Sequence, residues 1–113
     1  MLDKTENPII EFLRTRRSVV AANLGEPGPT EDELNTIIEV GLRVPDHSRC
    51  GPWRIQVIRK EAQAKLGALY AELFAKEDEN PTEEMIEYWR LRPQSAPILL
   101  AITCYPNEEK MAK

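Results

Sequence analysis

The chain has 113 residues, which is room for one domain at most. Hydrophobic residues make up 42% of it and charged residues 30%, a composition typical of a globular chain and not of a disordered one. The formal charge of -4 argues against general nucleic-acid binding, which requires a positive field. No apolar run approaches the roughly 20 residues of a membrane span, and the first residues lack the features of a signal peptide.

Cysteine and histidine usage limits the metal and redox chemistry. Cys50 and Cys104 stand far apart in different sequence contexts, which indicates reduced thiols in a cytoplasmic protein. A single histidine and the lack of a Cys-x-x-Cys pair argue against a zinc site. We therefore expect a cytoplasmic protein with no metal site and neither a membrane nor a nucleic acid as partner.

The first part of the chain predicts two helices separated by a loop. A short helix begins at Pro8, where proline is favoured, and Asn7 is its N-cap. The helical pattern ends over residues 18–29, and residues 25–29 (Gly-Glu-Pro-Gly-Pro) cannot form a helix, which predicts a loop. Residues 30–33 (Thr-Glu-Asp-Glu) fit a capping box, and apolar side chains at helical spacing then predict a helix over about 31–43.

The second part predicts two strands with two helices between them. Alternating side chains predict a strand over 53–59, and an amphipathic pattern predicts a helix over about 61–76. Thr82 follows an acidic break and can cap a short helix that runs to Trp89. The continuous apolar run over 98–105 is typical of a strand covered on both faces.

The number of predicted elements is itself informative. Four helices and only two strands indicate the α+β class, but two strands do not make an independent sheet. A strand covered on both faces also needs neighbours that this chain does not supply. Residues 108–113 resemble the first turn of a further helix. The sequence therefore predicts the front part of a larger domain.

Arginines gather in the first part of the chain. Seven of the nine lie at or before residue 59: Arg14, Arg16, Arg17, Arg43, Arg49, Arg54 and Arg59. Guanidinium groups suit phosphate and carboxylate recognition, so Arg16, Arg17 and Ser18 at the end of the first helix could clamp one phosphate. The alternative is that these cations only complement the negative end of the helix dipole.

Arg43 and the loop after it form a second polar cluster. His47 could be an acid, a donor to an anion or a pH sensor, and it could equally be an ordinary surface residue. Asp46, His47 and Ser48 include the residue types of a catalytic triad, but neighbours in sequence rarely converge. Neither a Gly-x-Ser-x-Gly nucleophile motif nor a glycine-rich phosphate loop occurs, which argues against a hydrolase.

Taken in order, these segments resemble the FMN-dependent nitroreductase family. The motifs are Arg16-Arg17-Ser18 after a short helix, a loop ending in residues 26–30, Arg43-Val44-Pro45-Asp46-His47, Pro52-Trp53 opening a strand, and Ser95-Ala96-Pro97 before a buried strand. The Arg-x-Pro-Asp-His motif is similar to that of a compact subgroup of the family. The resemblance covers essentially the whole chain, but only the front half or somewhat more of a family member.

This resemblance implies the α+β nitroreductase fold. Residues 1–113 would be a single nitroreductase-like domain, truncated at its C-terminal end, with helices around a small sheet. The family fold forms an intertwined homodimer and binds FMN at each end of the dimer interface. The resemblance therefore also implies a homodimer.

The resemblance further implies a function and its site. The protein would be an FMN-dependent oxidoreductase that passes reducing equivalents from NAD(P)H through the flavin to nitro compounds, quinones or similar small-molecule acceptors. Arg16, Arg17 and Ser18 would hold the phosphate and ribityl end of FMN, and Arg43 and His47 would also contact the flavin. The family generally needs no protein nucleophile, so the resemblance implies no catalytic side chain.

Two departures from the family pattern leave alternatives open. Arg49 replaces an asparagine of the wider family, and Gly51 replaces a glutamine, which removes an amide that could pair with the flavin or the substrate. One alternative is a non-catalytic remnant or dimerisation module of the same fold that does not bind flavin. Another alternative is a small anion-binding protein that uses only the arginine cluster.

Overall fold

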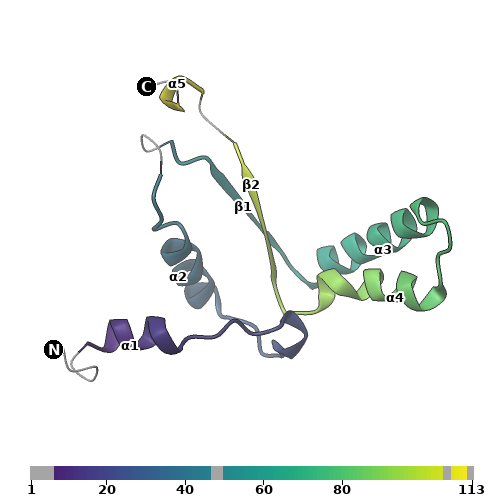
Figure 1. The fold of residues 1–113 in the computed structure, drawn as a ribbon, viewed down its shortest axis with the longest axis horizontal. Coiled ribbons are helices and arrows are strands. Elements are labelled where there is room, and N and C mark those ends of the chain that lie inside the picture. The colour runs from purple at the N-terminus through teal and green to yellow at the C-terminus, as the bar shows by residue number, and fades with distance from the viewer. Residues whose placement is uncertain (1–6, 47–49, 106–107, 112–113) are drawn as a thin grey trace.

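The computed structural model describes residues 7–46, 50–105 and 108–111. Its helices and strands follow one another as α1 (Pro8–Thr15), α2 (Glu31–Gly41), β1 (Trp53–Ile58), α3 (Lys60–Glu77), α4 (Glu83–Leu91), β2 (Leu99–Cys104) and α5 (Glu108–Met111), with short 3-10 turns η1 (Ala21–Asn23) and η3 (Arg92–Gln94). The α+β class and each predicted helix and strand are thereby confirmed (Figure 1). The turn η1, inside the predicted loop, was not expected.

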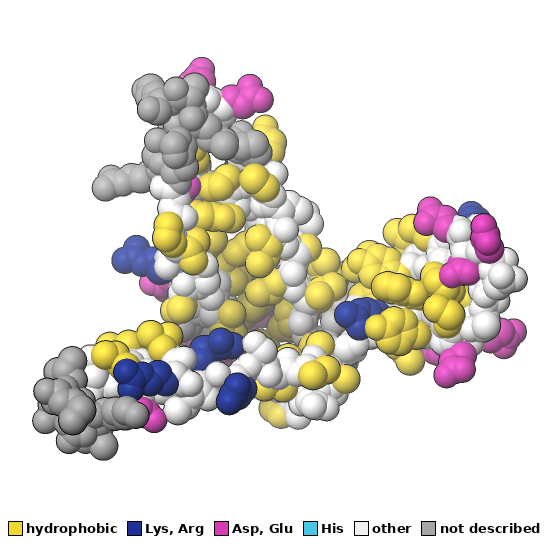
Figure 2. Space-filling view, in the orientation of Figure 1, with side chains coloured by type: hydrophobic (Ala, Val, Ile, Leu, Met, Phe, Trp, Pro, Cys, Tyr) yellow, Lys and Arg dark blue, Asp and Glu magenta, His cyan; other side chains and the backbone are white. Residues whose placement is uncertain are grey.

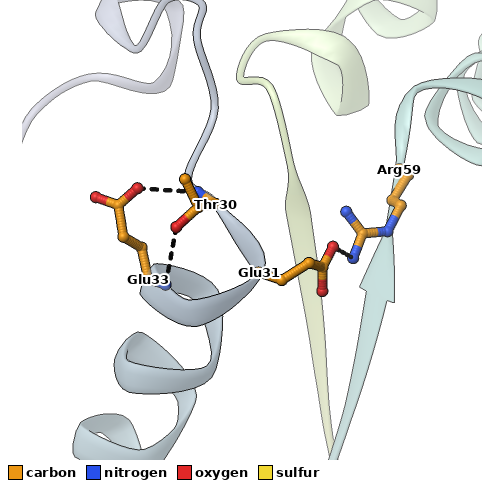
Figure 3. Close-up of polar contacts among 4 residues, drawn as sticks. All are labelled: Thr30, Glu31, Glu33 and Arg59. Carbon is orange, nitrogen blue, oxygen red and sulfur yellow. Dashed lines mark hydrogen bonds and ion pairs between the residues drawn. The ribbon is translucent and has the colours of Figure 1, made fainter.

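Side-chain caps explain where the first two helices begin. At α1, the Asn7 side-chain oxygen accepts hydrogen bonds from the backbone N–H groups of Ile9 (3.1 Å) and Ile10 (3.3 Å). At α2, Thr30 Oγ1 accepts from the Glu33 N–H at 3.2 Å, and Glu33 Oε1 accepts from the Thr30 N–H at 3.0 Å (Figure 3). Hydrogen bonds to the Glu33 carboxyl, first from the Thr30 backbone N–H and then from the Thr30 side chain, hold its pKa below the ordinary value.

The two strands form an antiparallel ribbon whose register runs from Trp53 opposite Cys104 to Ile58 opposite Leu99. Because side chains alternate along a strand, one face of β1 presents Trp53, Ile55 and Val57, and its opposite face carries Arg54. Helix α2 stands beside the apolar face, and a groove separates the two.

The expectation that the second strand is covered on both faces is wrong for this structure. The first half of β2 is only half-buried, and its second half is exposed, with Ile102 at 65%. The physical reason is that α2 borders a single face of the ribbon and stands off from it. Within the described residues, no element lies over the other face.

Helices α3 and α4 pack closely as a hairpin that projects from one end of the ribbon (Figure 1). The close approach occurs at Gly67, where an added Cβ atom would collide with the carbonyl oxygen of Arg90. The hairpin also holds the turn that leads into β2, because the buried Gln63 side chain donates to the carbonyl oxygens of Pro93 and Ala96, both at 2.9 Å. This turn carries the Ser-Ala-Pro segment of the sequence.

Two ion pairs tie the first residue of α2 and the loop before it to the junction between β1 and α3. Arg59 Nη2 lies 2.7 Å from Glu31 Oε1 (Figure 3), and Lys60 Nζ lies 3.2 Å from Glu26 Oε1. All four side chains are exposed. Because exposed pairs contribute at most about 1 kcal/mol, they fix the relative placement of these segments more than the stability of the fold.

The elements do not close around a common core. The radius of gyration is 19.1 Å, against about 13 Å for a compact domain of this length. Among the described residues, Leu34 and Ala71 are the buried hydrophobic side chains. Figure 2 shows hydrophobic side chains open to solvent over α2 and the ribbon and along the α3–α4 hairpin. The packing faces of these helices and strands are thus largely uncovered within the described part of the chain.

Candidate functional site

The predicted phosphate-binding segment follows α1 directly. Arg16 is the C-cap of this helix, and its backbone N–H donates to the carbonyl oxygen of Phe12 at 2.9 Å. Its side chain reaches Ser18, two residues further on, and Nη2 donates to Ser18 Oγ at 3.0 Å. Arg16, Arg17 and Ser18 are all exposed. The structure therefore brings two of the three predicted ligands together and leaves the segment open to an anion.

Arg43 lies in a different part of the chain. It follows α2 and its backbone N–H donates to the carbonyl oxygen of Val40 at 3.1 Å, which continues the last turn of the helix. Its side chain is exposed. The chain that leaves α1 passes the beginning of α2 (Figure 1), whereas Arg43 follows its end. The structure does not bring Arg43 to the Arg16–Ser18 segment.

The loop between α2 and β1 contains the fifth predicted site residue, His47, which lies outside the described residues, as does Arg49. The two ends of this loop are described. Asp46 Oδ2 accepts a hydrogen bond from the backbone N–H of Gly51 at 2.7 Å, and Gly51 has a φ of 54°. The sequence indicated Asp46 as a residue type found in triads and as part of the Arg-x-Pro-Asp-His motif, and it predicted no backbone contact for it. The local backbone contacts that an aspartate commonly makes reach about two residues on, so no sequence pattern indicated this contact five residues away.

Apolar grooves flank α2 on the side of the ribbon. One lies between α2 and the two strands and is lined by Ile37, Ile38, Gly41, Leu42, Trp53, Ile55, Leu100 and Ile102. A second lies where the loop before α2 meets the start of β2; its lining includes Leu24, Pro27, Leu34, Pro97 and Ile98. Gly28 allows the loop to approach here, because an added Cβ atom would lie 2.9 Å from Pro97 Cβ.

The structure was also searched for disulfides, for clusters of metal-ligating side chains and for helices that could span a membrane. Cys50 and Cys104 are both free thiols. Within the described ranges, no three or more histidine, cysteine, aspartate or glutamate side chains gather as metal ligands would. No helix in that part of the chain is long and apolar enough to cross a membrane.

Comparison with known proteins identifies relatives of this chain. The sequence model of the nitroreductase family matches residues 13–113. A protein of Escherichia coli K12 named "Putative NAD(P)H nitroreductase YdjA" is 33% identical over 101 residues, which are 88% of this chain and 52% of that protein. The protein of the same name from Escherichia coli O157:H7 matches equally well, with 33% identity over 101 residues. The chain spans about half the length of the curated relatives it matches.

Proposed function

The chain belongs to the nitroreductase family, and from this premise we propose that the protein is an FMN-dependent oxidoreductase. It would pass reducing equivalents from NAD(P)H through the flavin to nitro compounds, quinones or similar acceptors. The observation that carries the proposal is the Arg16–Ser18 segment, where a guanidinium and a hydroxyl lie in contact on an exposed stretch of chain. The name of the E. coli relatives supports NAD(P)H as the reductant.

The chemistry of this segment fits a phosphate group. A phosphate dianion offers several acceptor oxygens, and an arginine offers five N–H donors in a rigid fork. The bond from Arg16 to Ser18 takes up one of these donors. Arg16, Arg17 and Ser18 would therefore bind the phosphate end of FMN, with Arg43 and His47 as further contacts to the flavin.

The flavin, when bound, supplies hydride acceptance and donation, so no catalytic side chain is required of the chain itself. The residues named here bind and orient the cofactor. Guanidinium groups also remain charged throughout the physiological pH range. Cofactor binding through these guanidinium groups should therefore weaken as the ionic strength rises.

We further propose that the protein acts as a homodimer with the flavin at the interface. Two features support this proposal. Arg43 and the Arg16–Ser18 segment lie toward opposite ends of α2, so one copy does not gather them. The apolar side chains of α1 are also exposed, with Ile9 at 70% and Phe12 at 66%. Exposed apolar faces of this kind mark surfaces that associate.

The test is to purify the complete gene product and record its absorbance spectrum and mass in solution. A yellow dimer that carries FMN and oxidises NAD(P)H when a quinone or nitro compound is added supports the proposal. A colourless protein that ignores added FMN overturns it. If that colourless protein is a stable dimer, the non-catalytic dimerisation module becomes the better interpretation.

A further inference from the structure

The backbone of the ribbon has two edges, one along each strand. The register of the strands continues past β2, because the Tyr105 N–H donates to the carbonyl oxygen of Pro52. Opposite residues of an antiparallel pair alternate between those that bond to each other and those whose N–H and C=O groups point outward. Counted from this pair, the N–H and C=O groups of Leu100, Ile102 and Cys104 point away from β1, to the free edge of β2.

The outer edge of β1 is partly closed by one of its own side chains. By the same alternation, the N–H and C=O groups of Trp53, Ile55 and Val57 point to this edge. Arg54 Nη1 donates to the carbonyl oxygen of Trp53 at 3.1 Å, so a guanidinium already occupies an acceptor there. Charged side chains at the edge of a sheet discourage pairing with another strand.

The free edge of β2 has no such protection. The strand (Leu99–Cys104) carries no charged side chain, no proline and no glycine. In the described part of the chain, no hydrogen bond reaches the outward N–H and C=O groups of its three outward residues. An uncharged apolar strand with an open edge is a template for pairing with a further strand.

We propose that the free edge of β2 pairs with the same edge of a second copy of the chain, so that two ribbons form one four-stranded antiparallel sheet. A second copy suits this edge because β2 is self-complementary in antiparallel pairing about Ile102. Ile102 would lie opposite its own copy, and Leu100 would lie opposite the partner's Cys104. Outward groups then meet outward groups along the strand, and no like charges are opposed.

This pairing would supply what the ribbon lacks by itself. Two strands are marginally stable at best, whereas three or more with an apolar face can form an independent sheet. The exposed surface of 9818 Å² exceeds that of a compact monomer of this size by about 3,500 Å², which is comparable with the area that obligate interfaces bury. Ile102, 65% exposed, would lie at the centre of the contact. The inference does not rest on the proposed function, and its tests need no FMN.

One pair of variants separates the edge of β2 from general apolar association. Ile102→Pro removes an outward N–H and leaves the bonds between β1 and β2, because proline is tolerated where the N–H of an edge strand faces solvent. Ile55→Pro is the matched control, since Ile55 lies opposite Ile102 and loses an outward N–H at the other edge of the ribbon.

The first measurement is the dimer dissociation constant of the 113-residue chain, by sedimentation velocity over a range of concentrations. The wild type should form a dimer, and Ile55→Pro should match it. Ile102→Pro loses the two bonds that Ile102 would exchange with its copy, so its dissociation constant should rise about tenfold or more.

The second measurement, amide hydrogen exchange, needs no substitution. In the dimer, the amides of Leu100, Ile102 and Cys104 should be protected, and this protection should fall on dilution as the copies separate. The amides of Ala101 and Thr103 point to β1 in either state. They should exchange more slowly than the three outward amides at every dilution, and their protection shows that the ribbon is folded.

Four results would overturn the inference. Two of them are a monomeric wild type and an Ile102→Pro variant that associates as tightly as the wild type. The third is rapid exchange of the three outward amides in the associated protein, because the copies would then join elsewhere. The fourth is protection of these amides that does not change with concentration, because another segment of the same molecule would then cover the edge. If Ile102→Pro loses the protection of Ala101 and Thr103, it has not folded, and exchange in the wild type decides.

Discussion

Arg16 takes part in two contacts. Its backbone N–H ends α1 by donating to Phe12, and its guanidinium reaches Ser18 Oγ 3.0 Å away. A cation at the C-terminal end of a helix is favourable in its own right, so position alone does not distinguish a cofactor ligand from a dipole partner. Replacement of neighbouring cations does distinguish them, because only a ligand should change flavin affinity.

Arg16→Ala and Arg17→Ala should each weaken FMN binding by about 1.5–3 kcal/mol per lost charged hydrogen bond. Flavin affinity of the complete gene product is the measurement. Arg14→Ala is the matched control, because Arg14 is a basic residue in the last turn of the same helix and is not a predicted ligand. Unchanged affinity in both test variants would remove Arg16 and Arg17 from the site.

Individual contacts were predictable only where they are local in sequence. The cap of α2 follows from the residues of its first turn, and the Arg16–Ser18 contact spans two residues. The ion pair between Glu26 and Lys60 joins residues 34 positions apart, and no local pattern indicates such a pairing. The Asp46–Gly51 bond lies between these limits, since its residue types were visible but the left-handed backbone of Gly51 was not.

Helix α2 depends on the capping box at its beginning, where Thr30 and Glu33 exchange hydrogen bonds (Figure 3). Thr30→Ala should lower the free energy of unfolding by about 1 kcal/mol, the usual effect of losing an N-cap side chain. Thr30→Ser keeps the hydroxyl and is the control. Urea denaturation of the complete gene product, monitored by circular dichroism, is the measurement, and equal midpoints for Thr30→Ala and Thr30→Ser would contradict the prediction.

The same cap makes a pH-dependent contribution. The bonds from Thr30 lower the pKa of Glu33 in the folded state, so the ionised carboxylate favours folding. This contribution should be complete above the ordinary glutamate pKa and should be lost as the pH falls through the lowered value. Glu33→Gln should therefore show a smaller loss of stability on acidification than the wild type. Parallel pH profiles of the two proteins would contradict this expectation.

The α3–α4 hairpin depends on a glycine where the helices approach. Gly67→Ala would place a Cβ atom against the Arg90 carbonyl oxygen and 3.0 Å from Gln94 Nε2, and overpacking of this kind costs about 1–3 kcal/mol. We expect a lower thermal midpoint. Gly41→Ala is the control, because a Cβ atom there meets nothing within 4 Å. A midpoint for Gly67→Ala at or above that of Gly41→Ala would show that the helices can separate at little cost.

Helices and strands were predictable because their signals are local, whereas their covering was not. Capping residues and prolines indicated where α1, α2 and α4 begin. The apolar run of β2 was interpreted as a strand buried on both faces, yet Ile102 is 65% exposed. A hydrophobic pattern reports that a surface favours burial; which element buries it is decided by distant parts of the fold.

The chain exposes much more surface to solvent than a compact monomer of the same size would. Its exposed surface amounts to 9818 Å², whereas a compact monomer of this size exposes about 6,300 Å². The difference, about 3,500 Å², is comparable with the area buried in obligate interfaces. Much of it is apolar, since hydrophobic side chains cover the open faces of α2, the ribbon and the hairpin (Figure 2).

The 113-residue polypeptide, expressed by itself, should therefore neither remain a compact monomer nor hold FMN tightly. Its open apolar faces should drive association, and its predicted flavin contacts lie at separate places on one copy. Sedimentation velocity with detection at 280 nm and at the flavin absorbance band would measure both properties together. A monomer that sediments with stoichiometric FMN would contradict the prediction, because it would show that one copy of this segment gathers the whole site.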